Sequence, residues 1–204
     1  METLQYFIGS IWQAITPLEA IGFGCALVYS LLASYEKVWC WPFAIISTGI
    51  FTYMFFADNV KLQGSLQLFY LLMAAYGWYE WTYGKKDAEP LHITSFPLNK
   101  LLLVLLIGIP FTVAGGLLNQ HYNADMPFLD SAITIYSLIG TWMMAKKIIQ
   151  NWFFWMVIDP FSIWFFAERG RYLIAFLFFI YTLIAIFGYF KWRKEMNVQQ
   201  KAFG

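Results

Sequence analysis

Residues Tyr70–Trp81 read YLLMAAYGWYEW, and 111 residues later Tyr181–Trp192 read YTLIAIFGYFKW. Tyr, Leu, Ala, Gly and Trp coincide in this alignment, at 70/181, 72/183, 74/185, 77/188 and 81/192. At an offset of 110, residues 55–57 match 165–167, Lys37 matches Lys147 and Pro17 matches Pro127. Agreement at four separate places, with one residue of slip, indicates an internal duplication. Repeats that run in the same sense about an axis along the membrane normal are one design of transporters.

The composition places the chain in a membrane. It is 60% hydrophobic and 12% charged, whereas about a quarter of the residues of a soluble domain are charged. The net charge of +1 gives no basic surface for nucleic acid. About 20 apolar residues are needed to cross the hydrocarbon core, and the runs lack the alternation of an outer-membrane barrel. We therefore expect an all-α integral membrane protein with seven transmembrane helices, at 18–35, 39–57, 62–81, 98–117, 127–145, 151–168 and 171–190.

The fourth of these segments has no counterpart in the repeat. The expected architecture is therefore three helices, a linker helix and three more helices, a 3+1+3 arrangement. The corresponding units are a first bundle at 18–83, a polar loop and linker helix at 84–126, a second bundle at 127–192 and a tail at 193–204.

The first 17 residues precede the first bundle. Glu2 stands where a signal peptide would carry a basic residue. Leu4, Ile8, Ile11, Trp12 and Ile15 fall near one helical face, which is typical of a short helix lying in the membrane interface. A frayed leader is the alternative interpretation.

Lysine and arginine residues predict the orientation. With the C-terminus inside, ten of the 13 basic residues lie in cytoplasmic segments, and only Lys61, Arg169 and Arg171 lie outside. We expect the N-terminus outside and the C-terminus inside. The protein would then be a multi-pass protein of a bacterial inner membrane, surrounded by lipid.

The richest polar segment inside the membrane is 151–160, NWFFWMVIDP. Trp152, Trp155 and Asp159 stand at i, i+3 and i+7, so they share one helical face. Two indole rings near a carboxylate suit a flat cation through stacking, cation–π attraction and a counter-charge. Asp159 lies about eight residues, or ~12 Å, into the helix, where ionisable groups are costly and often functional. The alternatives are an interfacial position for Trp152 and a helix-to-helix hydrogen bond for Asp159.

Other candidate substrate-binding residues lie on neighbouring segments. Gln67 offers both a donor and an acceptor, and Tyr70 follows it on the same face. For Gln67, ligand contact and helix-to-helix bonding remain open. A helix cap explains Glu19, while Asp130, at the near-equivalent position, stays open between cap and ligand. The remaining candidates are Asn151, Tyr76 and Ser47; no metal site, cofactor or catalytic residue is predicted.

Three other protein classes fit less well. A retinal protein needs a lysine in its last helix, and residues 171–190 contain none. An intramembrane enzyme needs an activated nucleophile or a metal, and no GxSxG, HExxH or paired Cys/His occurs. A membrane scaffold without transport has no evident need for Asp159 behind two tryptophans.

Several of these motifs resemble the Pnu-type vitamin transporters. They are YGWYxW at Tyr76–Trp81 preceded by Gln67, the stretch Pro127–Ser131, and NWxxW at Asn151–Trp155. The resemblance covers roughly residues 18–192. It implies the 3+1+3 fold of a full-length SWEET-like carrier and a homotrimer. It also implies facilitated uptake of an unphosphorylated vitamin that a cytoplasmic kinase then traps.

The resemblance also bears on which vitamin is carried. The nicotinamide riboside branch typically has Asn where this chain has Asp159, and another Asn near Ser47. These departures favour the thiamine branch, because the thiamine aminopyrimidine can donate to a carboxylate. Nicotinamide riboside, also a ring cation, is the alternative, and riboflavin is third.

Overall fold

The computed structural model describes residues 16–58, 61–84, 91–122, 126–168, 170 and 172–203. The expected interfacial helix at 1–17 falls almost wholly outside them. The described residues form seven helices close to the predicted segments. They are α2 (Pro17–Ser34), α3 (Cys40–Ala57), α4 (Lys61–Tyr83), α5 (Leu98–His121), α6 (Pro127–Ala145), α7 (Asn151–Glu168) and α8 (Tyr172–Phe203).

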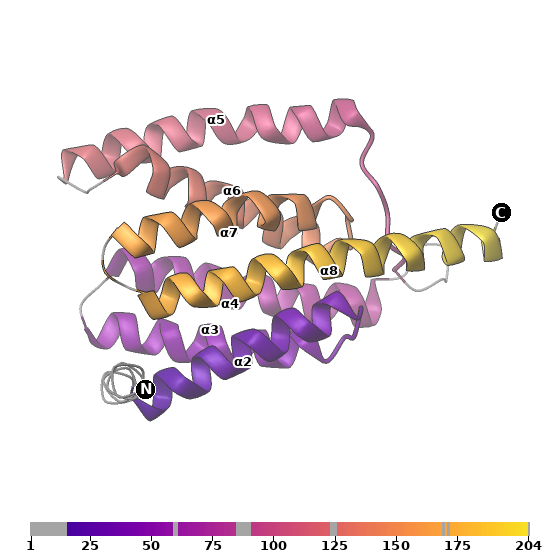
Figure 1. Cartoon of the computed structure of the whole chain (residues 1–204), viewed down its shortest axis with the longest axis horizontal. Helices are drawn as coiled ribbons and strands as arrows, with labels where there is room; N and C mark the ends of the chain where they lie inside the picture. The colour runs from indigo at the N-terminus through magenta and orange to yellow at the C-terminus, as the bar shows by residue number, and fades with distance from the viewer. Residues whose placement is uncertain are drawn as a thin grey trace, which may run out of the picture.

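The helices form two bundles of three and one linker helix. In the first bundle α3 packs against α2 and α4, and in the second α7 packs against α6 and α8. The bundles meet through α4 on α6 and α2 on α8, while α5 packs along α6 at the outer edge of the molecule (Figure 1). The all-α fold and the 3+1+3 arrangement are thus confirmed. Five of the described helices, all except α4 and α7, are long and apolar enough by themselves to cross a membrane.

Local signals set the helix ends. Thr16 and Glu19 form a capping box at the start of α2: the Glu19 backbone N–H donates to Thr16 Oγ1 and the Thr16 N–H donates to Glu19 Oε2. The cap expected for Glu19 is confirmed. The first helix of each bundle ends just before a left-handed residue, Glu36 (φ 58°) after α2 and Lys147 (φ 51°) after α6. These two residues are 111 positions apart, so the repeat extends to the turns. The structure therefore pairs Lys147 with Glu36 and not with Lys37, which the sequence alignment matched to it.

The last helix continues past the end of its apolar run. The predicted segment ends at residue 190, whereas α8 runs to Phe203 and projects beyond the other helices (Figure 1). Falling hydropathy marks where a chain leaves the membrane, and good helix formers such as Lys, Glu and Gln continue the helix beyond that point. Met196 packs on the core, and Gln199 Oε1 accepts the N–H of Ile93 at 3.1 Å. The tail is therefore a docked helical extension.

The two bundles share one internal packing device. In the first, the Trp41 ring lies directly on Gly77; in the second, the Trp152 ring lies on Gly188. A Cβ at either glycine would overlap the indole ring. Each of these tryptophans also meets a second one edge-on at 5.4 Å between ring centroids, Trp41 against Trp81 and Trp152 against Trp192. The Gly and Trp matches of the repeat therefore mark close helix contacts.

We predict that Gly77→Ala and Gly188→Ala each destabilise the protein by about 1–3 kcal/mol, the usual cost of overpacking. Gly49→Ala is the matched control, because nothing lies within 4 Å of its added Cβ and alanine is the better helix former. Thermal melting of the purified variants in detergent measures the difference. Equal melting temperatures for Gly77→Ala and Gly49→Ala would contradict this packing.

Candidate functional site

The candidate site is built on α7, whose predicted face points into the protein. Trp152 and Asp159 are buried, with 3% and 2% of their surface exposed, and Trp155 is half-buried. Trp155 lies 3.4 Å from the Cβ position of Gly140 on α6. The helix continues through Pro160 without a break. The three residues therefore lie along the interior face, from Trp152 near the start of α7 to Asp159 two turns deeper.

Asp159 lacks a partner for one carboxylate oxygen. Its Oδ2 is buried and accepts no hydrogen bond among the described residues. A buried polar atom without a partner costs about 1–3 kcal/mol, more if charged. Tyr181 on α8 is near enough to Asp159 for the two side chains to interact electrostatically. The position is therefore suited to a ligand that brings a donor or a positive charge.

On the other bundle, Tyr70 is the repeat counterpart of Tyr181. Its hydroxyl lies near the side chain of Ser137 on α6. Ser137 is one turn from Gly140, the residue that Trp155 contacts. Tyr70 and Trp155 therefore reach α6 on successive turns. Gln67, one turn before Tyr70, is half-buried.

The remaining predicted residues have other neighbours. Asn151 is fully buried and donates from Nδ2 to the Ile148 carbonyl at 2.7 Å, which fixes the turn before α7 and leaves its Oδ1 without a described partner. Asp130 Oδ2 accepts from Asn119 Nδ2 on α5 at 3.1 Å, and no side-chain cap is formed at this end of α6. Ser47 is buried on α3.

Tyr76 lies at the far end of α4 from Gln67. It neighbours Lys146, whose Nζ is 5.0 Å from the ring centre and 2.7 Å from Glu80 Oε1. Burial lowers the pKa of Lys146, but hydrogen bonds to Glu80 and Tyr76 raise it by more, so the net shift is upward. Tyr76 thus belongs to an ion-pair cluster at the end of the bundles where α4 and α6 finish. We call this the lysine-rich end.

Sequence reasoning missed Trp41, Ser137 and Tyr181. Trp41 is 1% exposed, and its Nε1, like that of Trp152, has no described hydrogen-bond partner. The signal was in the repeat, because Trp41 and Tyr181 stand 111 positions from Trp152 and Tyr70. Ser137 has no repeat signal.

A separate cavity of about 460 Å³ lies among α5, α6 and α7. Its lining is apolar, from side chains such as Leu101, Ile133 and Phe161, and none of the predicted site residues reaches it. Its described lining contains aromatic rings such as Tyr136 and Phe154 but no charged side chain that could pair with a cation. The polar chemistry lies on the opposite face of α7.

Residues 16–194 match the family described as nicotinamide mononucleotide transporter. The chain belongs to this family. It is 27% identical to the nicotinamide riboside transporter PnuC of Escherichia coli K12, over 91% of this chain and 88% of that protein. It is 22% identical to the riboflavin/roseoflavin transporter RibM of Streptomyces davaonensis, over 88% and 86%. A crystal structure of the vitamin B3 transporter PnuC has the same fold, with a TM-score of 0.73 at 17% identity, over 93% of this chain and 86% of that one.

Membership of this family makes the protein a multi-pass membrane transporter of the vitamin class and not an enzyme. The expectation of a Pnu-type carrier is confirmed at that level. These relatives are named for nicotinamide riboside and riboflavin rather than for thiamine. They favour the alternative ligand over our first choice.

We predict that Trp155→Leu weakens vitamin binding by about 1–3 kcal/mol, because leucine keeps bulk but removes the π face. Trp164→Leu on the same helix is the control, since Trp164 is 49% exposed on the surface. Isothermal titration of the purified variants with nicotinamide riboside and with thiamine measures both affinities. Normal binding of both vitamins by Trp155→Leu would show that Trp155 is a packing residue and not a ligand contact.

Proposed function

We propose that the protein carries nicotinamide riboside across the membrane by facilitated diffusion. The vitamin is a flat pyridinium cation joined to a ribose. One observation carries the proposal: Asp159, Trp155 and Tyr181 bring a buried carboxylate with an unpartnered oxygen together with aromatic side chains inside a transporter fold. Such a set attracts a desolvated ring cation. The 27% identity to a nicotinamide riboside transporter, over 91% of the chain, supports this ligand.

Thiamine is the second candidate, and Asp159 is the reason. The thiamine thiazolium is also a ring cation, and its aminopyrimidine adds an amine that can donate to Asp159 Oδ2. Riboflavin is neutral, so it gains no charge attraction from a buried carboxylate. The choice is therefore between two cations that differ in their second donor group.

The lysine-rich end is the cytoplasmic end in this proposal, by the positive-inside rule. A cytoplasmic kinase would phosphorylate the arriving vitamin and keep it from returning. This phosphorylation would set the direction of net transport, and no coupled ion is needed. The described acidic residues include no group of three or more that could hold a metal ion.

We predict that liposomes holding the protein equilibrate labelled nicotinamide riboside without concentrating it. Unlabelled nicotinamide riboside should compete more strongly than thiamine, and riboflavin should not compete. Imposed proton and sodium gradients are the controls and should leave the final level unchanged. Accumulation above equilibrium under either gradient would reject facilitated diffusion, and stronger competition by thiamine would select the second candidate.

We predict that Asp159→Asn lowers affinity for either cation by tenfold or more. At 4–5 Å and an effective dielectric of 20, a carboxylate attracts a ring cation by about 3–4 kcal/mol, and desolvation cancels part of this. Asp58→Asn is the matched control, because Asp58 is exposed at the end of α3. Titration with each cation and with its neutral-ring analogue separates the roles. Equal losses for cation and analogue would mean that Asp159 acts by hydrogen bonding alone.

A further inference from the structure

At the lysine-rich end the two bundles exchange matching hydrogen bonds. Trp81 of the first bundle donates from Nε1 to the carbonyls of Met144 (3.3 Å) and Ala145 (3.1 Å) at the end of α6. Trp192 of the second donates from Nε1 to the carbonyl of Ala33 at the end of α2, at 3.0 Å. Ala33 and Met144 are 111 positions apart, as are the two tryptophans. Each bundle thus caps the first helix of the other.

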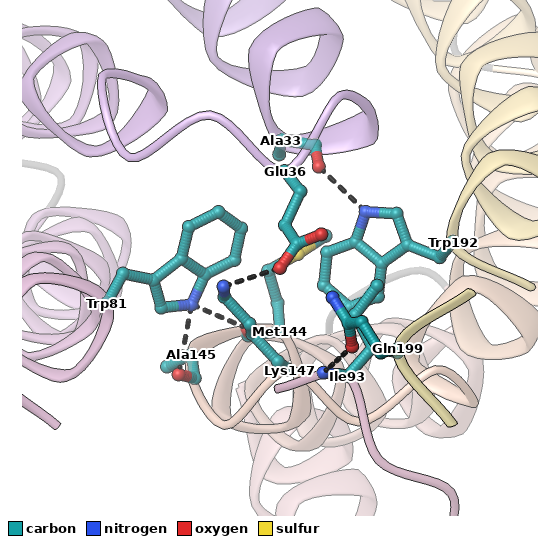
Figure 2. A network of polar contacts seen from close by, with 9 residues as sticks. All are labelled: Ala33, Glu36, Trp81, Ile93, Met144, Ala145, Lys147, Trp192 and Gln199. Carbon is teal, nitrogen blue, oxygen red and sulfur yellow. Dashed lines mark hydrogen bonds and ion pairs between the residues drawn. The ribbon is translucent and has the colours of Figure 1, made fainter. Parts of the chain in front are cut away.

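Between these two indoles lies an ion pair, as Figure 2 shows. Lys147 Nζ is 2.6 Å from Glu36 Oε1, and only 10% and 18% of the two side chains is exposed. The ammonium also lies 4.8 Å from the centre of the Trp81 ring. Glu36 and Lys147 are themselves repeat counterparts. Equivalent turns of the two bundles therefore meet each other directly, with opposite charges.

A second layer of contacts also crosses between the bundles. Lys146 pairs with Glu80 at 2.7 Å, and at the equivalent positions Lys191 Nζ lies 5.1 Å from the centre of the Tyr35 ring. The loop before α5 closes over one side: Thr94 bonds to the backbone of the α6–α7 turn, at the Lys147 carbonyl and the Ile149 N–H. This end is therefore closed by contacts that join one bundle to the other.

We propose that Glu36, Lys147, Trp81 and Trp192 form a latch that closes the lysine-rich end and must open in every transport cycle. A vitamin leaving the site around Asp159 towards this end has to pass between the bundles. Polar latch contacts suit a reversible closure, because water can replace each of them when the bundles separate. The proposal uses the transporter class of the family and does not depend on which vitamin is carried.

The chain contains its own reporter for the latch. Cys40 begins α3, is 0% exposed, and packs in the same core cluster as Ala33, Trp41 and Trp192. The other cysteine, Cys25, lies within α2 and is half-buried. In a Cys25→Ala background, a maleimide can react only with Cys40. Its labelling rate then measures how often this end opens.

The first experiment follows maleimide labelling of Cys40 by mass spectrometry in Cys25→Ala protein, without any vitamin. Glu36→Gln and Lys147→Gln should each label at least tenfold faster than the parent. The charge-exchanged double variant, Glu36→Lys with Lys147→Glu, should return towards the parental rate. Glu168→Gln and Lys194→Gln are matched controls, because both residues are exposed. Trp192→Phe removes one indole bond but keeps an aromatic ring, and should also label faster.

Parental rates in both single variants would overturn the latch. Fast labelling that the exchanged pair does not slow would mean that the two charges do not act as a pair, and would overturn it too. Melting temperatures of all variants are measured alongside. A variant that has lost cooperative melting is replaced in the comparison by Trp192→Phe.

The second experiment asks whether the closed end has to open. Glu36→Cys with Lys147→Cys, in protein lacking Cys25 and Cys40, is treated with a short bifunctional thiol reagent that a reductant cleaves. Cross-linking should lower vitamin uptake into liposomes at least tenfold, and reduction should restore it. Full uptake by the cross-linked protein would show a static brace and overturn the proposal. Uptake absent before cross-linking would count against the proposed vitamin, and the labelling result would still decide the latch.

Discussion

The indole N–H groups of two tryptophans, one fully buried and one half-buried, tie the bundles of this protein together. Trp81 lies near the end of α4, whereas Trp192 lies about three turns before the end of α8. Each indole donates to the last carbonyls of a helix in the other bundle. A buried donor without a partner costs about 1–3 kcal/mol, and these bonds remove that cost. The carbonyls of Ala33 and Met144 also accept the backbone N–H groups of Glu36 and Lys147, so the indoles add a second bond at each helix end. Neither bundle is therefore complete by itself.

This constraint places the candidate site. Trp41 and Trp152 pack on Gly77 and Gly188 and meet the capping tryptophans edge-on, so four indoles fill the space between the bundles at the lysine-rich end. Eleven residues separate Trp192 from Tyr181, or about 16 Å along a helix. Tyr181 and Asp159 therefore lie well behind the tryptophans. A vitamin held there would be screened from the lysine-rich side by the same rings that join the bundles.

Hydropathy and the repeat were enough to predict the seven helices and their 3+1+3 order, because bilayer thickness sets helix length and the duplication sets topology. They did not predict that α8 continues to Phe203, because a helix can extend beyond its apolar stretch. They also left the roles of Trp152 and Tyr76 open. In an apolar chain, a tryptophan facing lipid, a neighbouring helix or a ligand has the same sequence pattern. Gly188 lies opposite Trp152. Its match to Gly77 in the repeat was the only sign in the sequence that Trp152 makes a packing contact.

The Glu36–Lys147 pair explains what a duplicated chain gains over two copies of one bundle. A residue on a two-fold axis between identical chains meets itself, so this position would face Glu with Glu or Lys with Lys. Duplication lets the two copies of the position diverge to opposite charges, and repulsion becomes attraction at 2.6 Å. The same freedom applies deeper in the protein, where Asp159 stands 111 positions from Thr48. One bundle can thus supply a carboxylate to the site without a second, like charge opposite it.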